Sequence, residues 1–204
     1  MKLAALVAII VTICTPLAAQ MHGPALYDVV GVATDDVLQI RSGPDADSES
    51  IGSLRPDAQG IEVTAQSADG KWARINNTES SGWVALRYLR QRAAWADGTP
   101  FGLVCSGTEP FWGVRFVAGY LEVSDPYDSD QRYRAITQLR GAGTGFADLA
   151  ILGGTEEQPV SMIVSPAACN DGMSDRNFAL QVQLLRPNAA APLLSGCCSM
   201  VVGQ

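Results

Sequence analysis

Short apolar segments that alternate with polar residues recur along the first half of the chain. The segment 37–41 alternates before a Ser-Gly-Pro turn, and the segment 61–65 alternates again. A Ser-Ala-Asp-Gly turn at 67–70 then leads into another such segment at 71–75. A period of two residues predicts strands with one buried face, and frequent turns are typical of a small barrel or sandwich. We therefore expect a first β-unit over residues 27–90.

The second half continues this strand pattern. Its clearest segment, 178–184, carries an apolar side chain at every second position, which places these side chains on one face of a strand. No long helical pattern interrupts the series. The sequence predicts an all-β chain whose second unit, over residues 100–204, is an antiparallel β-barrel or sandwich. The connecting segment 91–99 has no strand periodicity and is expected to be a linker or a single helical turn.

The N-terminal segment has the composition of a signal peptide. Lys2 precedes an apolar stretch over residues 3–17, and small residues follow it up to Ala19. We predict cleavage after Ala19, which removes residues 1–19. The apolar stretch is shorter than the roughly 20 residues that span a bilayer, and Cys14 lacks the small preceding residues of a lipid-attachment site. We expect a periplasmic or secreted protein without a stable membrane span rather than a lipid-anchored one.

Four cysteines lie beyond the predicted signal peptide: Cys105, Cys169, Cys197 and Cys198. An even number in an exported chain predicts two disulfides. A bond between Cys197 and Cys198 would require a strained ring, so each is expected to pair with Cys105 or Cys169, in either combination. A zinc site from the same thiols is the alternative, but the Cys-x-x-Cys spacing is missing. We expect disulfides, no metal and no cofactor.

Several short motifs of the first unit occur in a recognisable order. In chain order they are Leu-Gln-Ile-Arg-Ser-Gly-Pro at 38–44, Ile-Gly at 51–52, Lys-Trp-Ala-Arg-Ile at 71–75, Gly-Trp-Val at 82–84 and Tyr-Leu at 88–89. This series resembles the bacterial SH3 (SH3b) domain, with Gln39 where that family usually has Asn. The resemblance implies a half-open barrel of five or six strands. It also implies a module that often binds cell-wall peptide or peptidoglycan.

The aromatic residues of this unit are candidates for its ligand site. Aromatic faces with one or two polar partners can hold a peptide or the face of a sugar. We predict a ligand groove formed by Arg41, Trp72, Trp83 and Tyr88. The alternative is core packing, which we expect for at least one of the two tryptophans in so small a barrel.

Two dense motifs mark the second half. They are Cys-Ser-Gly-Thr-Glu-Pro-Phe-Trp at 105–112 and Cys-Asn-Asp-Gly-Met-Ser-Asp-Arg at 169–176. With the closing Gly-Cys-Cys at 196–198, they resemble an uncharacterised domain of bacterial envelope proteins and lipoproteins. That resemblance implies a location and a fold family, and no activity is attached to it.

The same motifs supply a possible second site, formed by Glu109, Trp112, Asp171, Asp175 and Arg176. Glu109 stands beside aromatic residues that could raise its pKa and make it a general acid. Pairing with Arg176 would instead make Glu109 structural. The spaced oxygens of Asp171 and Asp175 invite comparison with a calcium loop. The bidentate Glu of an EF-hand is missing, and an ordinary turn is favoured.

The chain as a whole lacks the usual catalytic constellations. Its one histidine, His22, lies next to the predicted cleavage site, so Ser-His-Asp and Cys-His mechanisms have no base. The formal net charge of −7 argues against nucleic acid as a partner. We expect a non-catalytic envelope protein whose SH3b unit binds cell-wall peptide, peptidoglycan or another envelope protein. The alternatives are a carboxylate-based hydrolase of cell-wall material and a lysozyme inhibitor, a role that small disulfide-bonded periplasmic barrels fill.

Overall fold

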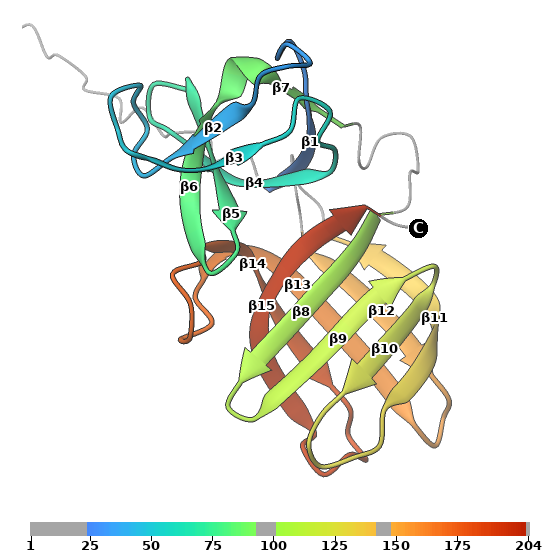
Figure 1. The fold of residues 1–204 in the computed structure, drawn as a ribbon. Helices are drawn as coiled ribbons and strands as arrows, with labels where there is room; N and C mark the ends of the chain where they lie inside the picture. Colours follow the sequence, from blue (N-terminus) through green and yellow to red (C-terminus); the bar gives the residue numbers. More distant parts are fainter. Residues whose placement is uncertain (1–23, 93–100, 142–147, 203–204) are drawn as a thin grey trace, which may run out of the picture.

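The computed structural model describes residues 24–92, 101–141 and 148–202 (Figure 1). The predicted signal peptide, His22 and most of the predicted linker lie outside these residues. The described residues form two β-sheets, which confirms the all-β prediction, and the second sheet is a closed barrel rather than a sandwich. None of their helical segments is long and apolar enough to cross a membrane.

The first sheet has seven strands within the described residues, in the order β3-β2-β6-β5-β4-β1-β7. Its elements are β1 (Ala25–Val29), β2 (Leu38–Arg41), β3 (Ser50–Leu54), β4 (Ile61–Gln66), β5 (Trp72–Asn77), β6 (Ser80–Ala85), the 3₁₀ helix η1 (Leu86–Tyr88) and β7 (Leu89–Gln91). Alternate strand positions point to one side, because successive side chains in a strand face opposite ways. These positions supply a core that includes Leu38, Ile40, Val63, Ala73, Ile75 and Val84.

Neither tryptophan of the first sheet belongs to this core, so the expectation that one would pack there was wrong. Trp72 and Trp83 are half-buried. They alternate with Ala73 and Val84, both fully buried, and therefore face the opposite side of the sheet. Smaller aliphatic side chains fill the core, and both indoles remain on the outer face.

The second sheet closes into an antiparallel barrel of eight strands in the described part of the chain. They are β8 (Phe101–Thr108), β9 (Phe111–Val117), β10 (Tyr120–Ser124), β11 (Gln131–Arg140), β12 (Leu149–Gly154), β13 (Pro159–Cys169), β14 (Phe178–Leu185) and β15 (Leu193–Val202). Pairing of β15 with β8 completes the ring, so the barrel has no free strand edge. Its interior is filled by apolar side chains that include Leu103, Leu121, Ile151, Met162, Leu180 and Leu184.

Two disulfides cross-link the barrel, one from each of the adjacent cysteines. Cys198 is bonded to Cys105, and Cys197 is bonded to Cys169. Because neighbours in a strand face opposite sides, Cys198 reaches its partner in the barrel core while Cys197 reaches outward to the end of β13. The prediction of two bridges, with no bond between the neighbours, is confirmed. The zinc alternative is wrong, because all four thiols are consumed.

The two sheets contact each other directly. Leu26 of β1 belongs to the apolar cluster of the barrel. The main-chain N–H of Asp175 donates to the carbonyl oxygen of Glu79 at 2.9 Å, and that of Asn177 donates to Ser81 Oγ at 2.9 Å. The loop between β13 and β14 is therefore held against the β5–β6 hairpin (Figure 1).

Candidate functional site

A cavity of about 400 Å³ opens on the first sheet. Its lining includes Arg41 of β2, Trp72 of β5 and Tyr88 of η1, three of the four residues proposed from the sequence. Trp83 lies beside them, opposite Arg41 and Arg74 in the strand register, but outside this lining. The fold thus gathers three of the four predicted side chains around one hollow.

Charged and aromatic groups share the wall of this cavity. The Arg87 guanidinium carbon lies 4.6 Å from the centre of the Tyr88 ring. Arg41 Nη1 donates to the carbonyl oxygen of Ser48 at 2.7 Å, which fixes the direction of its guanidinium group. The lining has these two arginines and one carboxylate, that of Asp36. Ligand pockets of ~300–1,000 Å³ commonly combine aromatic surface with a few fixed polar groups, so this hollow suits a small group with an apolar face and a carboxylate.

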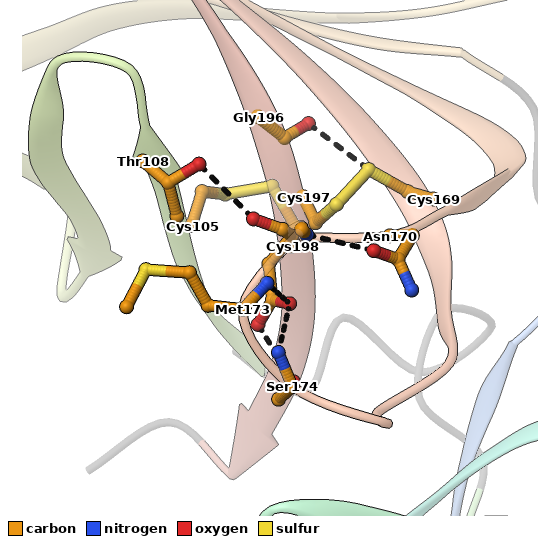
Figure 2. Close-up of a disulfide and its surroundings, with 11 residues drawn as sticks. Cys105, Thr108, Cys169, Asn170, Met173, Ser174, Gly196, Cys197 and Cys198 are labelled. Carbon is orange, nitrogen blue, oxygen red and sulfur yellow. Dashed lines mark hydrogen bonds between the residues drawn. A yellow bond between two sulfur atoms is a disulfide. The ribbon is translucent and has the colours of Figure 1, made fainter.

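The two dense motifs of the second half meet at another cleft, of about 570 Å³. Thr108 Oγ1 donates to the carbonyl oxygen of Asp171 at 3.0 Å, which joins one motif to the other. Figure 2 shows the Cys169–Cys197 disulfide fastening the same loop to β15. Both motifs contribute to the lining: Thr108, Phe111, Trp112, Asp171, Met173 and Ser174.

Of the five residues predicted for this second site, Trp112 and Asp171 line the cleft. Glu109 is exposed at the turn between β8 and β9 and is outside the lining. Asp175 faces the first sheet through its main chain. The Arg176 guanidinium lies over the Phe178 ring, 4.7 Å from its centre. The structure therefore divides the predicted residues among different contacts instead of gathering them into one carboxylate cluster.

The Asp171 carboxylate holds its own loop together. Its Oδ1 accepts the main-chain N–H groups of Met173 and Ser174 at 3.0 and 2.9 Å, and its Oδ2 accepts the Ser174 hydroxyl at 2.8 Å. Burial acts to raise the pKa of Asp171, but these donors and the Arg176 charge outweigh burial and lower it. The geometry is that of the turn favoured from the sequence. A carboxylate kept charged in this way braces a loop and is poorly suited to donate a proton.

Within residues 24–92, 101–141 and 148–202, no group of three or more His, Cys, Asp or Glu side chains is placed to hold a metal ion. The hollows described above are lined instead by aromatic, hydroxyl and charged groups.

The sequence interpretation missed Glu62, which the structure partly buries between the two sheets. Glu62 Oε1 accepts the main-chain N–H of Met200 at 2.9 Å. Burial raises the pKa of Glu62 to about 7, although the Met200 N–H and the Arg176 charge act in the opposite direction. The alternation at 61–65 already placed this side chain away from the local core. Nothing in that local pattern indicates that a second sheet covers it.

Residues 36–90 match the family model described as bacterial SH3 domain. The interpretation of the first unit as an SH3b domain is thereby confirmed. The match stops before the barrel, and no curated protein and no solved structure matches the chain. The resemblance of the motifs at 105–112 and 169–176 to an envelope domain is not confirmed by these comparisons.

Proposed function

We propose that this protein is an exported, non-catalytic binding protein whose SH3-like unit holds a cell-wall component. The observation that carries the proposal is the cavity lined by Arg41, Trp72 and Tyr88, which lies on the segment that matches the bacterial SH3 domain. Bacterial SH3 domains commonly bind cell-wall components. A concave site with fixed polar groups between aromatic side chains supports the same role here.

The lining favours a peptide carboxylate of the wall over a neutral sugar. Arg41 and Arg87 contribute two positive charges against the single negative charge of Asp36. Guanidinium groups bind carboxylates through paired N–H donors, and cell-wall peptides carry free carboxylates. Trp72 and Tyr88 would contact the apolar part of the same peptide.

Export to an oxidising compartment is supported by two independent features. The barrel contains two disulfides, which persist outside the reducing cytosol, and residues 1–19 have signal-peptide composition. Cell fractionation and N-terminal sequencing test this part. The expected result is an envelope or secreted protein that begins at Gln20, and a cytosolic protein that retains Met1 would contradict it.

A non-catalytic role is favoured over a hydrolase, because hydrolysis of this type requires two free carboxylates that flank the scissile bond. The cleft beside Trp112 is lined by Glu79, Asp125 and Asp171. Asp171 is committed to its own turn, and Asp125 forms a buried ion pair with Arg186. Turnover of purified peptidoglycan would overturn the proposal. Inhibition of lysozyme by the protein would favour the inhibitor alternative.

Co-sedimentation with purified peptidoglycan sacculi tests the binding role. The wild-type chain should sediment with sacculi, and Arg41→Gln and Tyr88→Ala should weaken binding at least about tenfold, or roughly 1.4 kcal/mol. Matched controls are Arg55→Gln, an exposed arginine of the same unit paired with Asp57, and Tyr127→Ala, an exposed tyrosine of the barrel. The proposal fails if the wild-type chain does not sediment. It also fails if folded cavity variants bind as well as the controls.

A further inference from the structure

The outer face of the barrel carries a groove that is separate from the SH3-like cavity. The cleft beside Phe111 adjoins a second hollow of about 540 Å³, and the two share Ser106, Gly113 and Ser124. These three residues form one cross-strand row, because Gly113 of β9 is opposite Ser106 of β8 on one side and Ser124 of β10 on the other. The two hollows are thus halves of one continuous groove across a shared floor.

The floor of the groove is formed by small residues, Ser106, Gly113 and Ser124. A Cβ atom at Gly113 would lie 3.4 Å from Ser124 Oγ and 3.8 Å from the Cys105 carbonyl oxygen, which are ordinary contact distances. The barrel itself would therefore accept a side chain at this position. Any larger side chain would project into the groove, so glycine keeps the floor open between two hydroxyl groups.

Beyond this floor, one end of the groove is charged but balanced. Arg132 Nε lies 3.3 Å from Glu122 Oε1, and both side chains are exposed. Arg115 and Asp130 complete the set of two arginines and two carboxylates along this end. Such an array offers several donors and acceptors with no net charge.

The other end of the groove carries two exposed apolar side chains among polar and acidic ones. The Phe111 side chain is 64% exposed and that of Met173 is 66% exposed, and both line the cleft. Large apolar side chains that are this exposed are candidates for contact with a ligand, because removing their surface from water on binding is favourable. Met173 stands on the loop that the Cys169–Cys197 disulfide fastens to β15, as Figure 2 shows. This wall is therefore held in place before any ligand binds.

We propose that this groove binds a linear carbohydrate chain. The apolar C–H faces of the sugar rings would lie on Phe111 and Met173, and the sugar hydroxyls would exchange hydrogen bonds with the floor serines and with the balanced charged end. Val104 to Thr108 of β8 follow the groove for roughly 13 Å at ~3.3 Å per residue, which favours an extended ligand over a single ring. The site does not depend on the role proposed for the SH3-like cavity.

An extended peptide and a nucleic acid fit this groove less well. A peptide commonly adds its main chain to an open strand edge, and the closed barrel has no such edge here. A nucleic acid requires a surplus of cations. At one end Arg115 and Arg132 are matched by carboxylates, and at the other the charged lining residues Glu79, Asp125 and Asp171 are acidic. A neutral chain of hydroxyl-bearing rings fits both ends.

Titration of the full chain with chitotetraose and with cellotetraose, followed by ¹H–¹⁵N NMR, tests the groove. The expected shifts concentrate on the amides around Ser106, Gly113 and Ser124. Gly113→Val fills the floor and Phe111→Ala removes the exposed ring, so each should weaken binding at least about tenfold. Controls at exposed positions of the barrel are Thr137→Val, which places the same side chain elsewhere, and Leu193→Ala, which removes another large apolar side chain. Both should bind as the wild type does.

Each outcome of the titration decides the proposal. Absence of shifts with both tetrasaccharides at millimolar concentration overturns it, and so do shifts located elsewhere or full binding by folded Gly113→Val. Competition by a linear peptide with no effect of either sugar would identify a peptide groove instead. Tyr88→Ala should leave the titration unchanged, so failure here is distinguishable from failure of the sacculus experiment.

Discussion

Glu62 of the SH3-like unit and Met200 of the barrel are joined by a hydrogen bond of 2.9 Å between a carboxylate oxygen and a main-chain N–H. The Met200 side chain belongs to the barrel core. Glu62 stands on β4 next to Val63, which belongs to the core of the first sheet. This contact therefore links a strand of one core to a strand of the other, and it does so through a partly buried ionisable group.

The partly buried Glu62 makes the stability of this junction depend on pH. Its pKa is raised from 4.5 to about 7, so the assembled state holds the proton more tightly than the unfolded state does. The junction is therefore most stable below pH ~4.5 and loses up to about 3 kcal/mol as the pH rises to about 7. The Arg176 charge, which favours ionised Glu62, is present over this whole interval.

Urea unfolding at about pH 5 and about pH 8 measures this dependence. Glu62→Gln keeps an acceptor for the Met200 N–H but cannot ionise, so its stability should vary much less between the two pH values. Glu122→Gln, at an exposed position of the barrel, is the control and should keep the wild-type dependence. The assignment to Glu62 is wrong if Glu62→Gln retains the full loss of stability.

Gly60 allows the close approach of the two units and has a matched control in the same sheet. Gly60 has φ +68°, and a Cβ atom there would lie 2.3 Å from Val202 Cγ2 of the barrel. Gly70 has φ +67° and no atom within 4 Å of the same position. Alanine at either site incurs the left-handed backbone cost of roughly 1–2 kcal/mol. Gly60→Ala should lose more stability than Gly70→Ala in urea unfolding, and equal losses would show that the Val202 contact contributes nothing.

The ion pair between Asp125 and Arg186 is buried in the barrel unit. Their side chains are 1% and 3% exposed. Asp125→Asn keeps the shape and an acceptor for the loop N–H groups but leaves the Arg186 charge buried without a counter-charge. We expect a loss of about 3–5 kcal/mol, against less than about 1 kcal/mol when the exposed Glu122–Arg132 pair is broken by Glu122→Gln. Thermal unfolding measures both, and similar losses would contradict the burial argument.

The two disulfides should contribute to different properties. In the chain-entropy account, the bridge of 93-residue separation contributes about 5 kcal/mol and that of 28-residue separation about 4 kcal/mol. Replacing Cys105 and Cys198 with alanine should therefore reduce stability more. Replacing Cys169 and Cys197 should release the loop that carries Met173 and weaken tetrasaccharide binding. Urea unfolding measures the loss of stability, and the NMR titration measures the loss of binding. The proposed role of the loop is contradicted if replacing Cys105 and Cys198 weakens tetrasaccharide binding while replacing Cys169 and Cys197 does not.

Much of the local structure could be predicted because its causes are local. The alternation at 61–65 and 178–184 predicts strands, since the two-residue period is a property of the strand itself. The Asp171 turn follows from side-chain bonds to N–H groups only two and three residues away. The motifs at 71–75 and 82–84 also belong to local structure, because their strands β5 and β6 form one hairpin. They could therefore identify the SH3b unit from the sequence.

The sequence could not decide what depends on how distant segments meet. At least one of Trp72 and Trp83 was expected in the core, and only the packing of smaller aliphatic residues leaves both on the outer face. The sequence offered Glu109 as the partner of Arg176, whereas the structure places the Arg176 guanidinium over Phe178, with its charge acting on Asp171 and Glu62. Such outcomes depend on which side chains from distant segments compete for the same contacts. The pattern of residues within one segment does not contain this information.

The sequence by itself thus determined the strands, the SH3b unit and the requirement that Cys197 and Cys198 take separate partners. Only the tertiary structure decided that Cys198 pairs inward with Cys105, because the direction of each side chain follows from closure of the barrel. Pairing of β9 with both β8 and β10 aligned Ser106, Gly113 and Ser124 as the floor of one groove. Contact between the sheets partly covered Glu62, since a polar position on an outer face is exposed until another unit covers it.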